Sequence, residues 1–278
     1  MTRPTAATVL FPLLLCACAQ PTRTPTDTQQ QLNIAVRSRP LVLLGEVHDN
    51  AAQHAMRAEA LRTLVESGAR PALLMEQFDR ERQADLDRAL AQPGATADAV
   101  IAAATPADPS RQGWSWAFYK PYIALAIEYR LPIVAANVSR NDTRRVLKDG
   151  LSSLGFEANV PTDIEAAQAS AIVDGHCGMI DTAMAGRMVG AQVARDQFMA
   201  RAIEANVARG AVLIAGNGHV RRDVGVPRWL SAAVRARSVA IGLLEPGDAY
   251  NAAFDVAFAT PAQSRSDPCE GMRGAPKP

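Results

Sequence analysis

The chain has 278 residues, a formal net charge of +1 and a mean hydropathy of −0.04. A net charge so close to zero argues against nucleic acid as a partner. With 21% charged and 48% hydrophobic residues, the chain is neither disordered nor a protein with several membrane spans. The length fits one large α/β domain or two smaller domains.

The first 17 residues have the pattern of a secretory signal peptide. Arg3 is their only charged residue, and the apolar run from Val9 to Leu15 is much shorter than the roughly 20 residues of a membrane-spanning helix. The next residues, Cys16-Ala17-Cys18, resemble a bacterial lipobox. We therefore expect cleavage before Cys18 and a lipid on Cys18; the alternative is an ordinary signal peptide that is cut nearby.

The remaining chain divides by composition. Residues 18–39 are mostly polar and rich in Thr and Pro near their start, so we expect a lipidated tether. Residues 261–278 have a similar composition and predict a flexible C-terminal tail. The segment between them, residues 40–260, is expected to form a single domain.

Short apolar runs alternate with helical patterns along residues 40–260. This alternation predicts βα units and an α/β fold with a mostly parallel central sheet that is flanked by helices. Strands are expected at residues 41–44, 72–75, 133–136, 212–215 and 239–244. Helices are expected at residues 51–67, 80–91, 116–129, 141–153, 183–208 and 228–236.

Polar and ionisable residues follow four of these five strands. Glu46 and His48 follow the first strand, Glu76 the second, Asn137 the third and His219 the fourth. Both histidines stand in a Gly-x-x-His frame. Because ligands of open parallel sheets bind at the carboxyl ends of the strands, we expect these side chains to line one crevice.

This set of residues is compatible with a divalent metal such as Zn or Mn, with His48, His219 and Glu76 as ligands. The alternative is that each residue only caps a helix or binds backbone groups. His54 is ambiguous, because it lies on the apolar face of the helix expected at 51–67, together with Leu61.

Five of the 14 aromatic residues lie between Trp114 and Tyr122. Such a patch suits a flat hydrophobic ligand, and Tyr119 or Tyr122 is a possible phenolate ligand of haem iron. The alternative is that these rings pack the start of a helix.

A third stretch combines His176, Cys177 and Met179, and His and Met are both known haem ligands. In an oxidising compartment a cysteine is more often disulfide-bonded than a ligand of a metal. With Cys16 in the signal peptide and Cys18 lipidated, we expect Cys177 to pair with Cys269. The chain has no Gly-x-Ser-x-Gly, Walker A, His-Glu-x-x-His or Cys-x-x-Cys-His motif.

Several motifs in order resemble the ChaN family of haem-binding lipoproteins, within the haem-binding uptake and Tiki superfamily. They are Leu-Gly-Glu-Val-His-Asp-Asn from residue 44, Met75-Glu76-Gln77, Trp-Ser-Trp at 114–116, Asn137, Ala194-Arg195-Asp196 and Ala-Gly-Asn-Gly-His-Val-Arg-Arg-Asp at 215–223. The resemblance implies a protein that is lipid-anchored in the bacterial outer membrane, exposed to the periplasm and active in haem or iron uptake. It also implies haem as the ligand, a possible homodimer and possible contact with an outer-membrane haem receptor.

The sequence thus predicts a haem-binding protein whose crevice contains the residues named above. The expected haem-binding residues are Glu46, His48, His54, Glu76, Tyr119, Tyr122, His176 and His219, with Tyr119 or Tyr122 as iron ligand. The resemblance also covers a metalloprotease branch of the superfamily. The competing hypothesis is therefore a metal-dependent peptidase or esterase that uses Glu46, His48, Glu76 and His219. A non-catalytic scaffold is a third interpretation.

Overall fold

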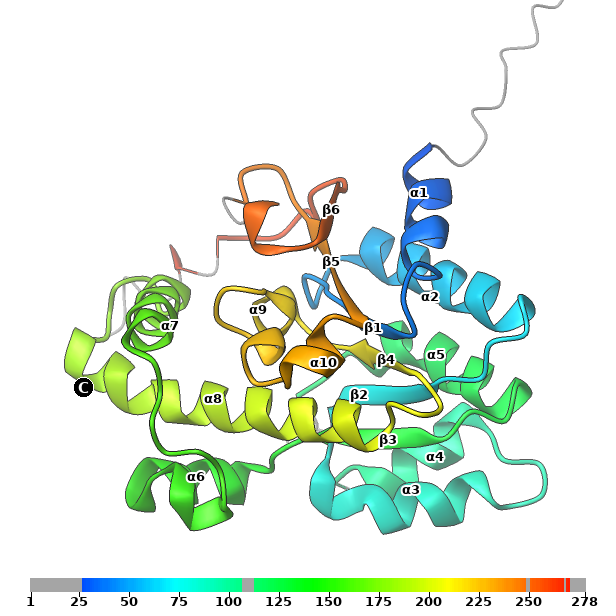
Figure 1. Cartoon of the computed structure of the whole chain (residues 1–278), viewed down its shortest axis with the longest axis horizontal. Helices are drawn as coiled ribbons and strands as arrows, with labels where there is room; N and C mark the ends of the chain where they lie inside the picture. Colours follow the sequence, from blue (N-terminus) through cyan, green and yellow to red (C-terminus); the bar gives the residue numbers. More distant parts are fainter. Residues whose placement is uncertain (1–26, 107–112, 249–250, 268, 271–278) are drawn as a thin grey trace, which may run out of the picture.

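The computed structural model describes residues 27–106, 113–248, 251–267 and 269–270. In this part of the chain, helices cover both faces of a central sheet of six parallel strands (Figure 1). The strands, in their order across the sheet, are β3 (Ile133–Asn137), β2 (Ala72–Asp79), β4 (Ala211–Ile214), β1 (Leu41–Leu44), β5 (Ser238–Leu244) and β6 (Val256–Ala259). The predicted α/β fold class and the five predicted strands are therefore confirmed; β6 was not predicted.

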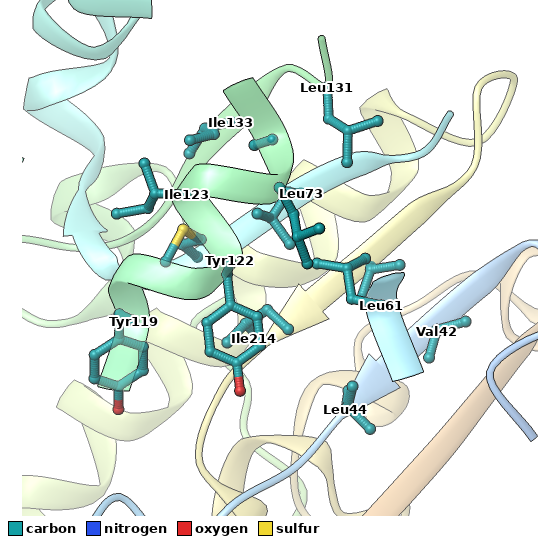
Figure 2. Close-up of a cluster of buried hydrophobic side chains, with 14 of the residues drawn as sticks. Val42, Leu44, Leu61, Leu73, Tyr119, Tyr122, Ile123, Leu131, Ile133 and Ile214 are labelled. Atoms are coloured by element: carbon teal, nitrogen blue, oxygen red, sulfur yellow. The ribbon is translucent and has the colours of Figure 1, made fainter. Parts of the chain in front are cut away.

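One face of the sheet packs against helices from the first half of the chain. They are α1 (Asp27–Ala35), α2 (Ala51–Glu66), α3 (Gln83–Leu90), α4 (Ala97–Ala104) and α5 (Trp116–Glu128). Their apolar side chains form one core with residues such as Val42, Leu73 and Ile214 of the strands (Figure 2). The stripe that was predicted for α2 is buried at His54, Leu61 and Val65.

Helices from the second half of the chain lie on the other side of the sheet, some on the strands and some on the long helix of this layer. They are α6 (Arg140–Asp149), α7 (Thr162–Gly175), α8 (Thr182–Ala205), α9 (Asn217–Val220) and α10 (Ala232–Arg235). Short 3₁₀ turns lie at Arg80–Arg82, Leu151–Leu154, Val226–Arg228 and Asn251–Ala253. The long helix α8 crosses this face, and it packs on the strands through Met199 and Ile203 and on α6 and α7 through Val189 and Val193 (Figure 1).

Helix caps explain several of the boundaries. The Asn50 side chain accepts a hydrogen bond from the Gln53 amide at the start of α2, and Asp181 does the same for Met184 at the start of α8. The helix that was predicted at 228–236 is instead a 3₁₀ turn followed by the one-turn α10. Helices α1, α4, α7 and α9 were not predicted.

The predicted tether ends earlier than expected. Helix α1 begins at Asp27, and its Leu32 is fully buried, as is Val36 just after the helix. Residues 27–39 therefore belong to the folded domain, because they bury apolar side chains against α2. The signal peptide and Cys18 lie outside the described residues.

The C-terminal segment through Asp267 is also bound to the domain, which corrects the prediction of a flexible tail for this part. Arg265 donates hydrogen bonds to Asp49 and to Glu245, and it lowers the pKa of Glu245 to about 2. The carbonyl of Pro261 accepts a hydrogen bond from the Asn50 side chain. No helix in the described part of the chain is long and apolar enough to cross a membrane.

Candidate functional site

The strand ends bring the predicted crevice residues together. Strand β4 lies between β1 and β2, so the residues after these three strands are neighbours at the carboxyl edge of the sheet. The Gly216 amide after β4 donates a 2.8 Å hydrogen bond to Oε2 of Glu76, and the Asn217 amide donates to the Glu46 carbonyl. The sequence spacing therefore correctly placed Glu46, Glu76 and His219 at one edge.

Glu46 is the centre of a buried polar network. Its carboxylate forms an ion pair with the guanidinium of Arg57, which is fully buried, and accepts a 2.5 Å hydrogen bond from the Tyr119 hydroxyl. Nδ1 of His48 lies 2.9 Å from the same oxygen, Oε1. Oε2 of Glu46 and Nε and Nη1 of Arg57 are buried without a hydrogen-bond partner, so the ion pair itself offsets part of the cost of burying these charges.

Arg57 was missed by the sequence analysis although a signal was present. Residues 54, 57 and 61 share one helix face at spacings of three and four, and that face is buried. An arginine on such a face needs a buried anion, and the preceding strand end supplies Glu46.

Both tyrosines point into the core rather than into an open site (Figure 2). The Tyr119 hydroxyl donates to Glu46, and the Tyr122 hydroxyl donates to the carbonyl of His54 at 3.0 Å. Burial raises the pKa of both phenols, so each remains protonated. In this structure both phenols are therefore occupied by protein partners, and an iron ligand at Tyr119 or Tyr122 stays a prediction.

His54 is a core histidine. Its ring stacks on Phe118 with centroids 4.5 Å apart, and its Nε2 lies 2.9 Å from the His48 carbonyl. Burial lowers its pKa and thus favours the neutral ring. With 3% of its surface exposed, His54 packs beneath the crevice, so its expected contact with haem stays a prediction that the observed burial does not favour.

His219 lies between two carboxylates. Its Nδ1 is 2.6 Å from Oδ1 of Asp196 on α8, and its Nε2 is 3.5 Å from Oε1 of Glu76. Burial alone would lower the pKa of His219, but Asp196 and Glu76 outweigh it and raise that pKa. The pKa of Glu76 is lowered although burial opposes this, because His219, His48, the Gly216 amide and Arg195 favour the carboxylate.

Asp196 had no assigned role in the sequence analysis, since it is 23 residues from His219 and only the packing of α8 joins them. It is fully buried, and burial raises its pKa. A carboxylate that holds one ring nitrogen of a histidine fixes the orientation of the ring.

His48 is the most open residue of this group, with 49% of its side chain exposed. Its ring packs against the edge of Trp114 at 5.0 Å and over Gly216, where a Cβ atom would lie 2.9 Å from Nε2. In the described residues, no group of three or more His, Cys, Asp or Glu side chains is arranged to hold a metal ion. His48, His219 and Glu76 surround Gly216 without forming such a group.

A polar cavity of about 360 Å³ adjoins the crevice at the ends of β2 and β3. Its walls include Trp114, Arg195, Gln77 and Asn137, so the polar residue that follows the third predicted strand also faces this edge. Arg195 contributes to the low pKa of Glu76, which links the cavity electrostatically to His219.

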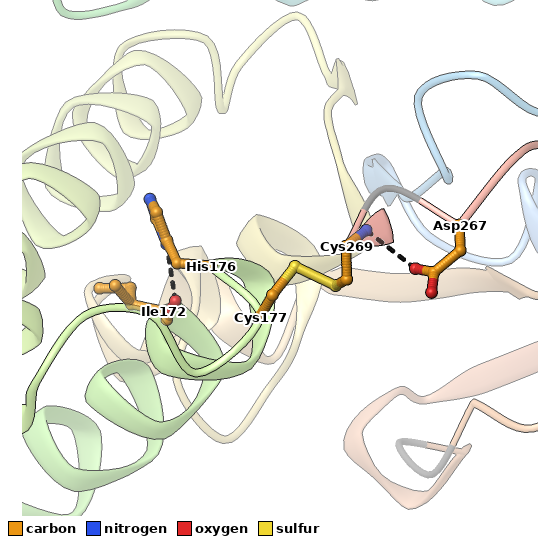
Figure 3. The surroundings of a disulfide bond; sticks show 5 residues. All are labelled: Ile172, His176, Cys177, Asp267 and Cys269. Atoms are coloured by element: carbon orange, nitrogen blue, oxygen red, sulfur yellow. Dashed lines mark hydrogen bonds between the residues drawn. A yellow bond between two sulfur atoms is a disulfide. The ribbon is translucent and has the colours of Figure 1, made fainter. Parts of the chain in front are cut away.

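His176 lies apart from the strand ends but shares a hollow with His219. The hollow has a volume of about 280 Å³ and is lined by Gln168, Ile172 and Gln192 besides the two histidines. Nδ1 of His176 is 2.7 Å from the carbonyl oxygen of Ile172 (Figure 3). Because a carbonyl oxygen only accepts hydrogen bonds, Nδ1 is the donor, and in the neutral ring Nε2 therefore has a lone pair.

The predicted disulfide between Cys177 and Cys269 is present (Figure 3). It joins the residue after His176 to the C-terminal segment. Two exposed methionines follow it in the chain, Met179 between α7 and α8 and Met184 in the first turn of α8, with 38% and 42% of their surface exposed. Met179 of this third stretch thus adds an exposed apolar side chain near His176, whose carbonyl accepts a hydrogen bond from the Met179 amide.

Comparisons with known proteins identify the family and agree with the fold. A family model described as haem-binding uptake, Tiki superfamily, ChaN matches residues 34–230. Among solved structures, ChaN of Campylobacter jejuni with cofacial haem has a TM-score of 0.67 at 16% identity, over 82% of this chain and 90% of that chain. The type III effector HopBA1 has a TM-score of 0.51 at 15% identity, over 85% and 94% of the two chains. No curated protein matches the sequence.

Proposed function

Because the chain belongs to the ChaN family of the haem-binding Tiki superfamily, we propose that it binds haem at the hollow between α7 and α9, with His176 as iron ligand. The hydrogen bond from His176 Nδ1 to the Ile172 carbonyl carries this proposal. Histidines that bind metals usually donate their other ring N–H to a carbonyl or carboxylate, which fixes the tautomer and the ring.

The other histidines are less suitable. Nδ1 of His48 is held by Glu46 in a comparable way, but its Nε2 packs on Gly216, where a Cβ atom would lie 2.9 Å away. Both ring nitrogens of His219 face carboxylates, Asp196 and Glu76. Both nitrogens of His54 are buried. Nε2 of His176 is the imidazole nitrogen that adjoins both a hollow and an exposed apolar surface.

The size of the hollow supports haem shared between two copies of the chain. Its 280 Å³ is below the roughly 300–1,000 Å³ of enclosing small-molecule pockets, so a flat ligand would stay partly exposed. Met179 adds an exposed apolar side chain next to His176, one of the residues that line the hollow. The related Campylobacter protein binds haem cofacially. Two copies of this chain that face each other at this hollow would cover two stacked haem groups.

The cellular setting also belongs to this proposal. The N-terminal pattern supports a signal peptide of 17 residues, a lipid on Cys18 and an outer-membrane protein exposed to the periplasm. The disulfide agrees with an oxidising compartment. In that setting the protein would act in haem or iron uptake, and an outer-membrane haem receptor is a plausible partner.

A titration of the purified protein with hemin tests the proposal. The expected result is a saturable change of the Soret band that is lost in His176→Ala and kept in His48→Ala, the matched control with the other partly exposed ring. Unchanged binding in His176→Ala, or equal loss in both variants, would refute His176 as the ligand. Absence of saturable binding in the unmodified protein would refute haem binding itself.

One observation favours the alternative of metal-dependent hydrolysis. Asp196, His219 and Glu76 contact one another in series. This resembles the arrangement in which a carboxylate orients a histidine for general acid–base catalysis. Glu46 and His48 would be the other two residues of this hydrolase site. Elemental analysis of protein purified without chelator separates the two functions, since stoichiometric Zn or Mn without hemin uptake would support hydrolysis.

A further inference from the structure

The amino edge of the sheet, opposite the crevice, is marked by a row of arginines. An arginine precedes each of β1 to β5 by one to three residues, and all five side chains are exposed. In sheet order they are Arg130, Arg70, Arg209, Arg39 and Arg237. None of the five forms an ion pair with a described carboxylate. The net charge of +1 for the whole chain therefore conceals a local excess of positive charge.

Backbone contacts place these arginines side by side. The Pro40 carbonyl accepts a hydrogen bond from the Ala211 amide, which joins the segments that carry Arg39 and Arg209. The Ala72 amide bonds to the Gly210 carbonyl in the same way, next to Arg70 and Arg209. With neighbouring strands about 4.8 Å apart, five strands spread this charge over roughly 19 Å.

Two hollows open between the arginines. The larger, of about 520 Å³, has Arg39, Arg222 and Arg235 in its walls, where Asp255 pairs with Arg222 at 3.2 Å. The second, of about 430 Å³, is lined by Arg130 and Arg209 and contains Asp87. Each hollow thus has more guanidinium groups than carboxylates.

Favourable interaction of the arginines with the negative carboxyl ends of helices does not explain the row. Helix carboxyl ends lie at the same edge and attract cations, and Arg70 does donate to the Val65 carbonyl at the end of α2. Arg237 donates to the Val207 carbonyl just after α8. Arg39, Arg130 and Arg209, however, donate no side-chain hydrogen bond to a helix carbonyl in the described structure. Their charge is left for another partner.

An exposed apolar side chain accompanies these charges. Ile34 on α1 has 63% of its surface exposed, the largest value for a large hydrophobic residue in the described chain. It lies three residues before Arg37 and five before Arg39, which are also exposed. Apolar side chains that stand beside basic ones are typical of surfaces that rest on the interface of an anionic membrane.

We propose that the amino edge of the sheet and the end of α1 dock on a membrane surface of anionic phospholipids, whose headgroup phosphates bind in the arginine-lined hollows. The position of the predicted lipid agrees with this orientation. Nine residue steps separate Cys18 from Asp27, which limits their distance to roughly 32 Å. The carboxyl edge, with His219 and Glu76, then faces away from the membrane. Haem binding is not required for this docking.

A vesicle-binding assay tests the docking surface. The sample is the chain from residue 18 with Cys18→Ser, which removes the lipid and keeps every described residue. We expect binding to vesicles of equal parts phosphatidylglycerol and phosphatidylcholine, little binding to phosphatidylcholine alone, and weaker binding at high salt. The triple variant Arg39→Gln, Arg235→Gln, Arg237→Gln should lower the affinity about 100-fold, at about fivefold per arginine.

The matched control replaces three exposed arginines elsewhere, Arg88, Arg144 and Arg145, by Gln and should retain most of the affinity. Ile34→Ser should weaken binding in the background of the unchanged arginines. Equal loss in the two triple variants, or binding that does not depend on phosphatidylglycerol, would overturn the proposal. Inhibition of vesicle binding by millimolar inorganic phosphate at constant ionic strength would assign the hollows to free phosphate and would also overturn it. All measurements are made without hemin, so a failed hemin titration does not affect them.

Discussion

The Nδ1 atom of His176 lies 2.7 Å from the carbonyl oxygen of Ile172, four residues earlier at the end of α7 (Figure 3). This contact fixes which ring nitrogen carries the proton and holds the ring at the mouth of the hollow shared with His219. The next residue, Cys177, is joined to the C-terminal segment. The proposed ligand is therefore held by a helix end on one side and a disulfide on the other.

Removal of this disulfide should destabilise the protein. Cys177 and Cys269 are 92 residues apart in the sequence, so the bond restricts a long loop in the unfolded chain. We expect the double variant Cys177→Ser, Cys269→Ser to lose about 2 to 4 kcal/mol of unfolding free energy, measured by urea denaturation. The unmodified protein in reductant is the control and should show the same loss. An unchanged midpoint in both samples would contradict this prediction.

The two buried tyrosines should differ in their contribution to stability. Tyr119→Phe removes a hydrogen bond to the charged Glu46 and should cost about 1.5–3 kcal/mol. Tyr122→Phe removes a bond to the neutral His54 carbonyl and should cost about 0.5–1.5 kcal/mol. Chemical denaturation measures both values, and hemin affinity should stay unchanged. Loss of the hemin spectrum in Tyr119→Phe alone would show that this phenol does reach the iron.

His219 should titrate above the ordinary histidine range and His54 below it, because the carboxylates raise one pKa while burial lowers the other. A raised pKa means that protonated His219 stabilises the fold below its unfolded pKa, and that this contribution is lost as the pH rises through the folded pKa. Histidine ring signals in NMR spectra measure both values. Asp196→Asn should lower the pKa of His219 and leave that of His54 unchanged; an unchanged His219 would refute the pairing.

Gly45 should be indispensable because neighbouring atoms leave no room for a Cβ atom, and not because its backbone angles require glycine. A Cβ atom there would meet Oδ1 of Asn217 and, at 3.1 Å, the Ile241 carbonyl. We expect Gly45→Ala to cost about 1–3 kcal/mol of unfolding free energy. Gly218→Ala is the control, since no atom lies within 4 Å of its Cβ position, and its unfolding free energy should be nearly unchanged. Similar losses in both variants would contradict the steric explanation.

The sequence by itself determined the parallel sheet and the edge at which the ionisable residues gather. Buried strands of four to six apolar residues and amphipathic helices are local patterns, and a parallel sheet places the residues after its strands on one side. For this reason Glu46, Glu76 and His219 were placed correctly. The disulfide followed from the small number of cysteines left after the N-terminal pair was assigned.

The tertiary structure decided what each side chain faces. Tyr119 and Tyr122 share a helix with exposed residues, and only the packing of α5 on α2 showed that both hydroxyl groups point inward. Asp196 reaches His219 across 23 residues, and the Arg265 contacts to Asp49 span 216. Local periodicity contains no information about such pairs, because they form only when distant segments pack. The orientation of each ring nitrogen, and with it the choice among four histidines, therefore required the folded structure.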